Sequence, residues 1–157
     1  MTTVSIIGNG NMGSAIGAIV AAGGNSVEVV GRDASDPITG DIVVLAVPHF
    51  AIDEIVAARG ADLAGKVVVD ITNPLNFETF DSLVVPADGS ATTVLIAGDD
   101  DLAKQALADV VRAGGLNAVD AGSLARAREL ESVGFLQLTA AVGEKIGWTG
   151  GFALVAA

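Results

Sequence analysis

Cysteine and tyrosine are absent from this sequence, and histidine occurs once, at His49. Without cysteine the chain can form no disulfide bond and can use no thiolate as a nucleophile or metal ligand. Freedom from disulfides is typical of proteins in reducing compartments, so we expect a cytoplasmic protein.

Positive charge is scarce. The chain has 8 lysines and arginines against 19 acidic residues, which gives a formal net charge of −11. This balance argues against nucleic acid as a partner, because a phosphate backbone requires a basic surface. It also means that an anionic ligand must be held by local features, since the overall field repels it.

Long hydrophobic runs are also missing, although hydrophobic residues make up 51% of the chain. No stretch reaches the roughly 20 uninterrupted apolar residues that a membrane-spanning helix needs. The most apolar stretch, residues 12–22, is interrupted by two glycines and a serine. No basic leader precedes the apolar run that begins at Val4, so we expect neither a membrane span nor a secretory signal.

Short runs of β-branched residues alternate with alanine-rich stretches of helical length. This alternation predicts an α/β protein with a Rossmann-like, doubly wound, mostly parallel sheet. We expect one domain over residues 1–157, with a Rossmann core at 1–122 and a C-terminal helical segment at 123–157. Four predicted strands are expected to be buried on both faces: 4–7, 27–30, 42–47 and 67–71. Two more strands are predicted at 93–97 and 117–120. The predicted helices are 12–22, 52–59 and 102–113.

Residues 124–146 form the long helical stretch of the C-terminal segment, with no strand after it. Its apolar side chains could cover the sheet or contact a second subunit, and these two interpretations do not exclude each other. We expect a homodimer. The apolar positions are Leu130, Val133, Leu136, Leu138 and Val142.

The stretch VSIIGNGNMGSAIG places three glycines between a predicted strand and a predicted helix. Gly8 permits a sharp turn, Gly10 lets the backbone approach a pyrophosphate, and Gly13 lets the helix pack closely on the strand. The helix N-terminus at Asn11 and Met12 offers backbone N–H groups to an anion. The pattern predicts a dinucleotide site, and the alternative is a glycine turn without a ligand.

The end of the second predicted strand indicates which dinucleotide would bind. Sites that select NAD usually carry an acidic residue there for the ribose 2′-hydroxyl, whereas this chain has Gly31 and Arg32. Gly31 leaves space, and the Arg32 guanidinium can form forked hydrogen bonds with a 2′-phosphate. The sequence therefore favours NADP(H). The alternative is that Arg32 is an ordinary surface residue.

Two further segments follow strands at the same predicted sheet edge. Val47, Pro48 and His49 follow the third strand, where a stiff loop could run beside the nicotinamide ribose. We interpret His49 as a wall or hydrogen-bonding residue of the cofactor site, with proton donor as the alternative. After the fourth strand, Asn73 could bind the nicotinamide side of the ligand, and Pro74 would stiffen its turn.

No nucleophile triad, carboxylate pair or metal-ligand cluster is evident, so no catalytic residue is assigned beyond the open case of His49. Hydride transfer needs none of these, because it needs two rings held face to face in a dry pocket. The acidic run Asp99–Asp101 is interpreted as helix capping, with a cation site as the alternative.

Several segments together resemble the F-420-dependent NADP oxidoreductases, in which the reduced deazaflavin coenzyme F-420 exchanges hydride with NADP. They are SIIGNGNMGSAIG, VVGRD, VLAVPHFAIDEI, VVVDITNPLNFETFDSLVVPADGSA, IAGDDDLAKQAL and VDAGSLARARELESVGFLQL. The resemblance implies a deazaflavin stacked over the nicotinamide and walled partly by the C-terminal helix. It implies NADP contacts at Gly8, Asn9, Gly10, Asn11, Met12, Gly31, Arg32, Val47, Pro48, Asn73 and Pro74.

One departure from the family pattern is an apparent internal deletion. Family members carry a longer segment between VVPADGSA and VLIAGDD, including a strand and a helix beside the substrate pocket, whereas here Ala91 runs straight into Thr92. Two alternatives therefore stay open beside F-420 chemistry. One is an NADP-binding module without F-420 activity. The other is an NADPH-dependent reductase of a small imine or carbonyl, in which His49 would donate the proton.

Overall fold

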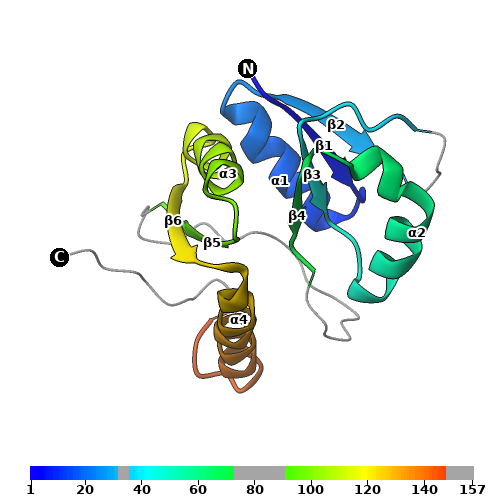
Figure 1. Ribbon diagram of the computed structural model, residues 1–157. Helices are drawn as coiled ribbons and strands as arrows, with labels where there is room; N and C mark the ends of the chain where they lie inside the picture. The colour runs from blue at the N-terminus through cyan, green and yellow to red at the C-terminus, as the bar shows by residue number, and fades with distance from the viewer. Residues whose placement is uncertain (32–35, 73–90, 148–157) are drawn as a thin grey trace. The chain divides into compact units, whose positions relative to one another are not determined.

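Two separate parallel sheets organise the protein, as the computed structural model shows (Figure 1). The structure describes residues 1–31, 36–72 and 91–147. The chain divides into two compact units, Met1–Leu83 and Val84–Ala157, and each unit contains one of the sheets. Parallel strands with helices packed on them confirm the predicted α/β, Rossmann-like fold. The expectation of one domain over residues 1–157 stays a prediction.

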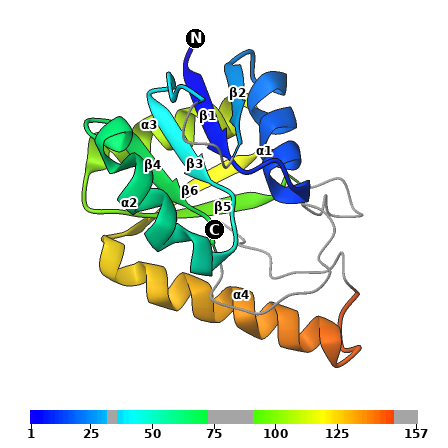
Figure 2. The ribbon, with the colours of Figure 1, turned by 90° about the vertical axis from the view of Figure 1, so that its right-hand side faces the viewer.

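The first unit has four parallel strands in the order β2-β1-β3-β4 (Figure 2). The chain adds β2 on one side of β1 and then returns past β1 to add β3 and β4 on the other side. Open α/β sheets bind ligands at such a reversal, outside the carboxyl ends of the strands. The elements are β1 (Thr3–Ile7), α1 (Asn11–Ala22), β2 (Ser26–Val30), β3 (Ile42–Leu45), the 3-10 turn η1 (His49–Ala51), α2 (Ile52–Leu63) and β4 (Val67–Asp70).

Burial separates the central strands of this sheet from its edge strands. Every residue of β3 is buried, and β1 is buried after its first residue, so the prediction of burial on both faces holds for these two strands. It is wrong for β2 and β4, where Val29 and Val68 are exposed. A run of valines therefore indicates a strand, but it does not distinguish a central strand from an edge strand.

Four elements begin one residue earlier than predicted, β6 ends two residues later, and three further ends in the first unit differ from the prediction. β3 ends at Leu45 instead of residue 47; the Ala46 N–H still donates to the Ile7 carbonyl oxygen at 2.9 Å, but Pro48 has no N–H to extend the ladder. β4 ends one residue earlier than predicted, at Asp70. α2 continues past Gly60 to Leu63, because a helical glycine costs only about 1 kcal/mol and Leu63 packs on the buried cluster.

The two helices of the first unit cover opposite faces of the sheet (Figure 1). On the α1 face, Gly17 lies against Ile6 and Val27, close enough that an added Cβ would meet their methyl groups. On the other face, Ile55 and Leu63 of α2 pack against the buried cluster around Ile7. Because successive strand residues point to opposite faces, Ile6 and Ile7 anchor the two layers.

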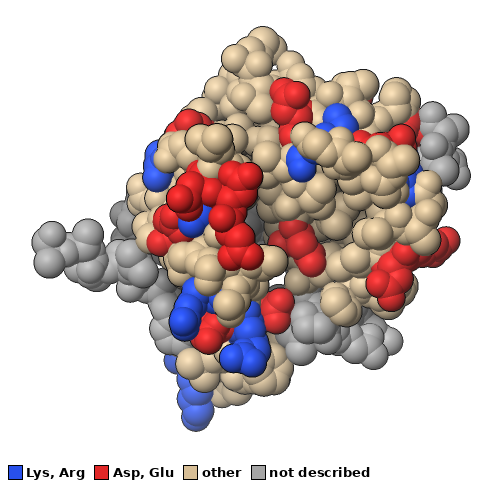
Figure 3. Space-filling view, in the orientation of Figure 1, with Lys and Arg blue, Asp and Glu red and all other residues tan. Residues whose placement is uncertain are grey.

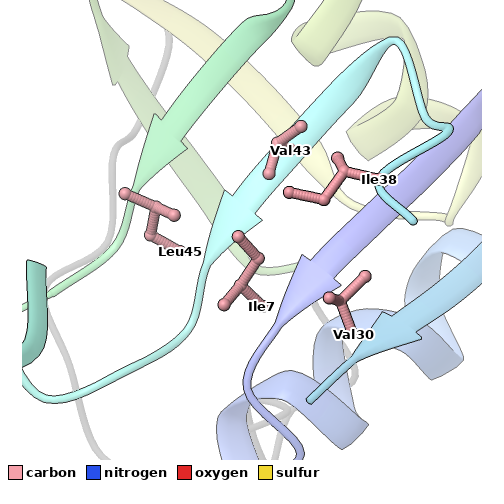
Figure 4. Close-up of a cluster of buried hydrophobic side chains, with 5 residues drawn as sticks. All are labelled: Ile7, Val30, Ile38, Val43 and Leu45. Atoms are coloured by element: carbon pink, nitrogen blue, oxygen red, sulfur yellow. The ribbon is translucent and has the colours of Figure 1, made fainter. Parts of the chain in front are cut away.

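The connection between β2 and β3, residues 31–41, differs from an ordinary parallel crossover. Such crossovers usually contain a helix, but the described part of this one, residues 36–41, contains none. Ile38 points into the sheet instead and joins the buried cluster (Figure 4). Ile38 thus shares this face of the sheet with the α2 side chains Ile55 and Leu63. The cluster consists of Ile7, Val30, Ile38, Val43 and Leu45.

The second unit contains a two-stranded parallel sheet and one helix packed on it. Ile96, Ala108 and Ala118 form its buried cluster, with Val94, Leu107 and Val111 around them. β5 pairs with β6 and with no other strand among the described residues. The elements are β5 (Thr93–Ala97), α3 (Asp101–Ala113), β6 (Asn117–Gly122), η2 (Leu124–Arg126) and α4 (Ala127–Val142).

The long C-terminal helix is shorter than the sequence predicts. It ends at Val142, because Gly143 caps it and Glu144 adopts a left-handed conformation with φ of 56°. Several apolar side chains on it are exposed, among them Val133, Phe135 and Leu136. The predicted homodimer stays a prediction, as does the cytoplasmic location. In the parts of the chain that the structure describes, none of the helices has the length and apolar character to cross a bilayer.

Candidate functional site

The turn between β1 and α1 can be formed only with glycine at two positions. Gly8 has φ of +121°, and a Cβ added there would lie 2.2 Å from the Ala46 carbonyl oxygen. A Cβ on Gly13 would lie 2.1 Å from the Gly8 carbonyl oxygen. These distances are far below van der Waals contact, so the fold itself requires both glycines.

Gly10 differs from both, because nothing in the fold requires a glycine there. Its φ of −75° and ψ of −174° are open to any residue, and an added Cβ would meet no atom within 4 Å. Gly10 is also the N-cap of α1, where no side chain accepts a hydrogen bond and the first turn carries no acidic residue. The predicted residues Asn9, Asn11 and Met12 are exposed beside it. This helix N-terminus therefore suits an external anion.

The end of β2 brings a second backbone donor to the same edge of the sheet. Gly31 follows β2 directly, and its N–H donates to the Asp36 carboxylate, with 3.3 Å between the nitrogen and Oδ2. Gly8 is tied to this strand, because its N–H donates to the Val30 carbonyl oxygen at 3.2 Å. Arg32, the predicted partner of a 2′-phosphate, lies outside the described residues.

The loops after β3 and β4 meet at His49. The His49 Nδ1 atom lies 3.3 Å from the Thr72 hydroxyl oxygen, and the Thr72 N–H donates to the Asp70 carboxylate at 2.7 Å. Pro48 precedes η1 with an extended backbone, and Val47 packs against the buried cluster. The His49 ring is exposed and joined to a neutral hydroxyl. The predicted residues Asn73 and Pro74 lie outside the described residues.

The candidate residues of the first unit therefore gather where its parallel strands end. The glycine turn follows β1, Gly31 follows β2, and residues 47–49 follow β3. β1 and β3 are neighbours in the sheet, so the glycine turn and the Val47 loop flank the reversal of strand order. The predicted roles of these residues stay predictions, but the structure brings the described ones to one edge.

A polar network beneath this edge was not predicted from the sequence. Glu28 on β2 accepts hydrogen bonds from the Ser5 hydroxyl and from Thr39, whose N–H and hydroxyl lie 2.9 and 3.1 Å from the carboxylate. The Gly40 N–H donates to the Ser5 oxygen at 2.9 Å. Burial alone would raise the Glu28 pKa, but these hydrogen bonds outweigh burial and lower the pKa below 4.5.

Arg59 is the other functional candidate that sequence reasoning missed. Its side chain is only 5% exposed, although arginine is rarely buried. The guanidinium donates to the Asp36 carbonyl oxygen and pairs with the Asp62 carboxylate at 3.1 Å. Arg59 thus holds the connection between β2 and β3. The sequence around it is that of an ordinary helix end, so only its position in the fold shows this contact.

The acidic run in the second unit serves mainly as capping, as predicted. Asp100 accepts hydrogen bonds from the Leu102 and Ala103 N–H groups, at 2.9 and 3.0 Å, and so caps α3. Asp99 accepts from the Leu124 N–H at 2.9 Å and caps η2. The run contributes to the acidic surface over α3 (Figure 3).

Lys104 lies between two carboxylates at the end of this acidic run. Its amine is 3.0 Å from Asp101 and 2.8 Å from Asp120, so hydrogen bonds raise the pKa of Lys104 and lower that of Asp120. The three side chains line a hollow of about 160 Å³, which also reaches Arg112 and Gln105. Its lysine is already paired with carboxylates, so it is not an open anion site.

Part of the chain matches a known protein family. Residues 26–74 match the family described as NADP oxidoreductase, coenzyme F420-dependent. The family resemblance is confirmed. The match covers about a third of the chain and spans Gly31, Arg32, the Val47–His49 loop, Asn73 and Pro74. At the level of the family description, the chain is similar to NADP-dependent oxidoreductases. No curated protein matches it.

Solved structures resemble the protein over most of its length. A candidate F420-dependent NADP-reductase from Arthrobacter sp. FB24 has a TM-score of 0.80 and 18% identity, over 99% of this chain and 100% of that one. A hypothetical protein from Sinorhizobium meliloti has a TM-score of 0.60 and 25% identity, over 80% and 87%. A Plasmodium falciparum pyrroline carboxylate reductase with NADP bound has a TM-score of 0.55 and 16% identity, over 94% and 71%.

Proposed function

We propose that this protein binds NADP(H) at the carboxyl edge of the β2-β1-β3-β4 sheet and transfers hydride between NADP(H) and the deazaflavin coenzyme F-420. The family match supports the coarser part of this proposal, an NADP-dependent oxidoreductase. The F-420 part has support from the family, which is described as coenzyme F420-dependent, and from the similarity to the candidate F420-dependent NADP-reductase of Arthrobacter.

The observation that carries the proposal is the contrast among the three glycines of the turn. The fold explains Gly8 and Gly13 through close contacts with neighbouring backbone, and it gives no reason for Gly10. A glycine beside an uncapped helix N-terminus is explained when a ligand's phosphates approach the backbone closely. The residues present therefore fit a dinucleotide pyrophosphate, and a neutral backbone site can hold it in a strongly acidic protein.

The other residues of the edge have matching roles in this proposal. Gly31 and Arg32 would hold the 2′-phosphate, and the Val47–His49 loop with Asn73 would border the nicotinamide end. NADP(H) itself supplies a hydride donor or acceptor, and the chain orients it and excludes water. The exposed His49 ring contacts a threonine hydroxyl, which favours an orienting residue over the proton donor that an imine or carbonyl reductase needs.

The test of the cofactor site compares two glycine substitutions by titration with NADPH. In Gly10→Ala the new methyl group occupies the space proposed for the pyrophosphate, and we expect at least about tenfold weaker binding, or ~1.4 kcal/mol. Gly60→Ala is the matched control, because its Cβ also meets no atom within 4 Å but lies inside α2. Equal NADPH affinity in both variants, with both folded, would contradict the proposed site.

The F-420 part needs a separate measurement with the unmodified protein. We expect reduced F-420 to bind to the NADP-loaded protein, and stopped-flow absorbance to show its oxidation as NADPH forms. NADPH binding without any F-420 binding would contradict this part and favour the binding module. Turnover of a small cyclic imine with NADPH, abolished in His49→Ala, would favour the reductase instead.

A further inference from the structure

The connection between β2 and β3 is held in place by polar contacts on three sides. The buried Arg59 guanidinium donates to the Asp36 carbonyl oxygen, and Glu28 accepts from the backbone and hydroxyl of Thr39. The Gly40 carbonyl oxygen accepts from the Lys66 amine at 2.7 Å. With Ile38 buried in the sheet, the backbone from Asp36 to Gly40 is fixed at both ends.

This anchoring directs the Asp36 side chain toward the end of β2. Its carboxylate accepts from the Gly31 N–H, at 3.3 Å between nitrogen and Oδ2, while the rest of the side chain is exposed. Gly31 is the first residue after β2, the place where dinucleotide sites contact the adenosine ribose. An acidic group therefore reaches this place from the crossover connection, even though the residues directly after β2 are Gly31 and Arg32.

We propose that Asp36 determines the cofactor preference of this site, because its carboxylate holds the Gly31 N–H that a 2′-phosphate would need. The inference rests on the proposed function, since it concerns the ribose end of the same dinucleotide. NADP(H) must displace the carboxylate from Gly31 to place its 2′-phosphate there. NAD(H) can leave it in place, and its 2′-hydroxyl can then donate to Asp36.

The physical basis is repulsion between like charges. A carboxylate and a phosphate within a few ångströms repel each other, and solvent exposure reduces this repulsion. The Asp36 carboxylate therefore lowers the preference of the site for NADP(H) over NAD(H).

The test measures NADPH and NADH affinities in Asp36→Asn. Asparagine keeps an oxygen that accepts from the Gly31 N–H but removes the charge, so the connection keeps its structure. We expect NADPH to bind about tenfold tighter, NADH to change less than about twofold, and the gain to shrink in ~1 M salt, where screening is strong. Asp41→Asn is the matched control, because it removes the same charge from the residue preceding β3, at the opposite end of the strands.

The outcomes separate this inference from the function on which it rests. An unmodified protein that binds neither NADPH nor NADH contradicts the proposed function, and the inference falls with it. An unmodified protein that binds NADPH, with the same NADPH-to-NADH ratio in Asp36→Asn, contradicts the inference alone. An equal change in Asp41→Asn also contradicts it, because the effect would then reflect net charge.

Discussion

Two turns of this protein connect a strand to a helix in the same number of residues, and their helix ends differ. Residues 8–10 join β1 to α1, and residues 98–100 join β5 to α3. Both begin with glycine, but the N-cap is Gly10 in one turn and Asp100 in the other. Asp100 accepts from two N–H groups of α3, whereas Gly10 has no side chain that could accept from α1.

This difference concerns which groups satisfy the N–H groups at the start of each helix. Unsatisfied N–H groups at a helix start are ordinarily bonded by a side chain of the cap residue. In α3 the protein supplies its own carboxylate, and Asp101 adds another charge in the first turn. In α1 the N-cap is a glycine, in the unit whose sheet reverses its strand order beside this turn.

The largest effect on stability is expected when the first glycine of each turn is replaced by alanine. Gly8→Ala places a Cβ 2.2 Å from the Ala46 oxygen at φ of +121°, so we expect a loss of about 3 kcal/mol or more in unfolding free energy. Gly98→Ala places a Cβ 3.3 Å from the flexible Lys104 side chain, and we expect less than ~1 kcal/mol. Urea denaturation measures both, and equal losses would show that the turns are equivalent.

An intermediate effect is expected when the caps are altered. Gly10→Asp gives α1 a carboxylate cap like that of α3, so we expect NADPH affinity to fall about 100-fold, by ~2.7 kcal/mol, without a loss of thermal stability. Asp100→Ala removes the cap of α3 and should lower the unfolding free energy by ~1 kcal/mol, with NADPH affinity unchanged. Unchanged NADPH affinity in Gly10→Asp would contradict the proposal that the cofactor binds at the N-terminus of α1.

The smallest effect is expected on stability at acid pH. It is compared between Glu28 in the first unit and Asp120 in the second. The Glu28 pKa is lowered in the folded protein, so its stabilising contribution is present above about pH 4.5 and is lost as pH falls through the lowered value. Glu28→Gln should therefore flatten the decline of melting temperature at acid pH. Asp120→Asn, which removes a more exposed partner of Lys104, should flatten it less. The reverse order would contradict the role given to Glu28.

The sequence was sufficient to predict the order and nature of the elements. Alternating runs of β-branched and alanine-rich residues identified each strand and helix, because their periods differ. The glycine turn was predicted with its neighbours, since Gly8, Gly10 and Gly13 have a fixed spacing and a strand before them. The capping role of Asp100 followed from its place before an amphipathic helix.

Contacts between distant parts of the chain could not be predicted in the same way. The burial of Arg59 depends on the crossover connection 23 residues earlier, where it binds the Asp36 carbonyl oxygen. The Glu28 network joins β1, β2 and the same connection, so no local pattern reveals it. The edge character of β2 and β4 depends on strand order, which a run of valines does not determine.

The way in which residues 36–41 are attached to the sheet has a consequence for engineering and divergence. A helix packed on a sheet constrains many side chains at once, so its sequence changes only with compensating changes in the core. Residues 36–41 are attached through Ile38, Thr39 and Gly40 to the sheet and through the Asp36 carbonyl oxygen to Arg59. Because Arg59 binds the carbonyl oxygen of Asp36 and not its side chain, that side chain can be exchanged while this attachment of the connection stays the same.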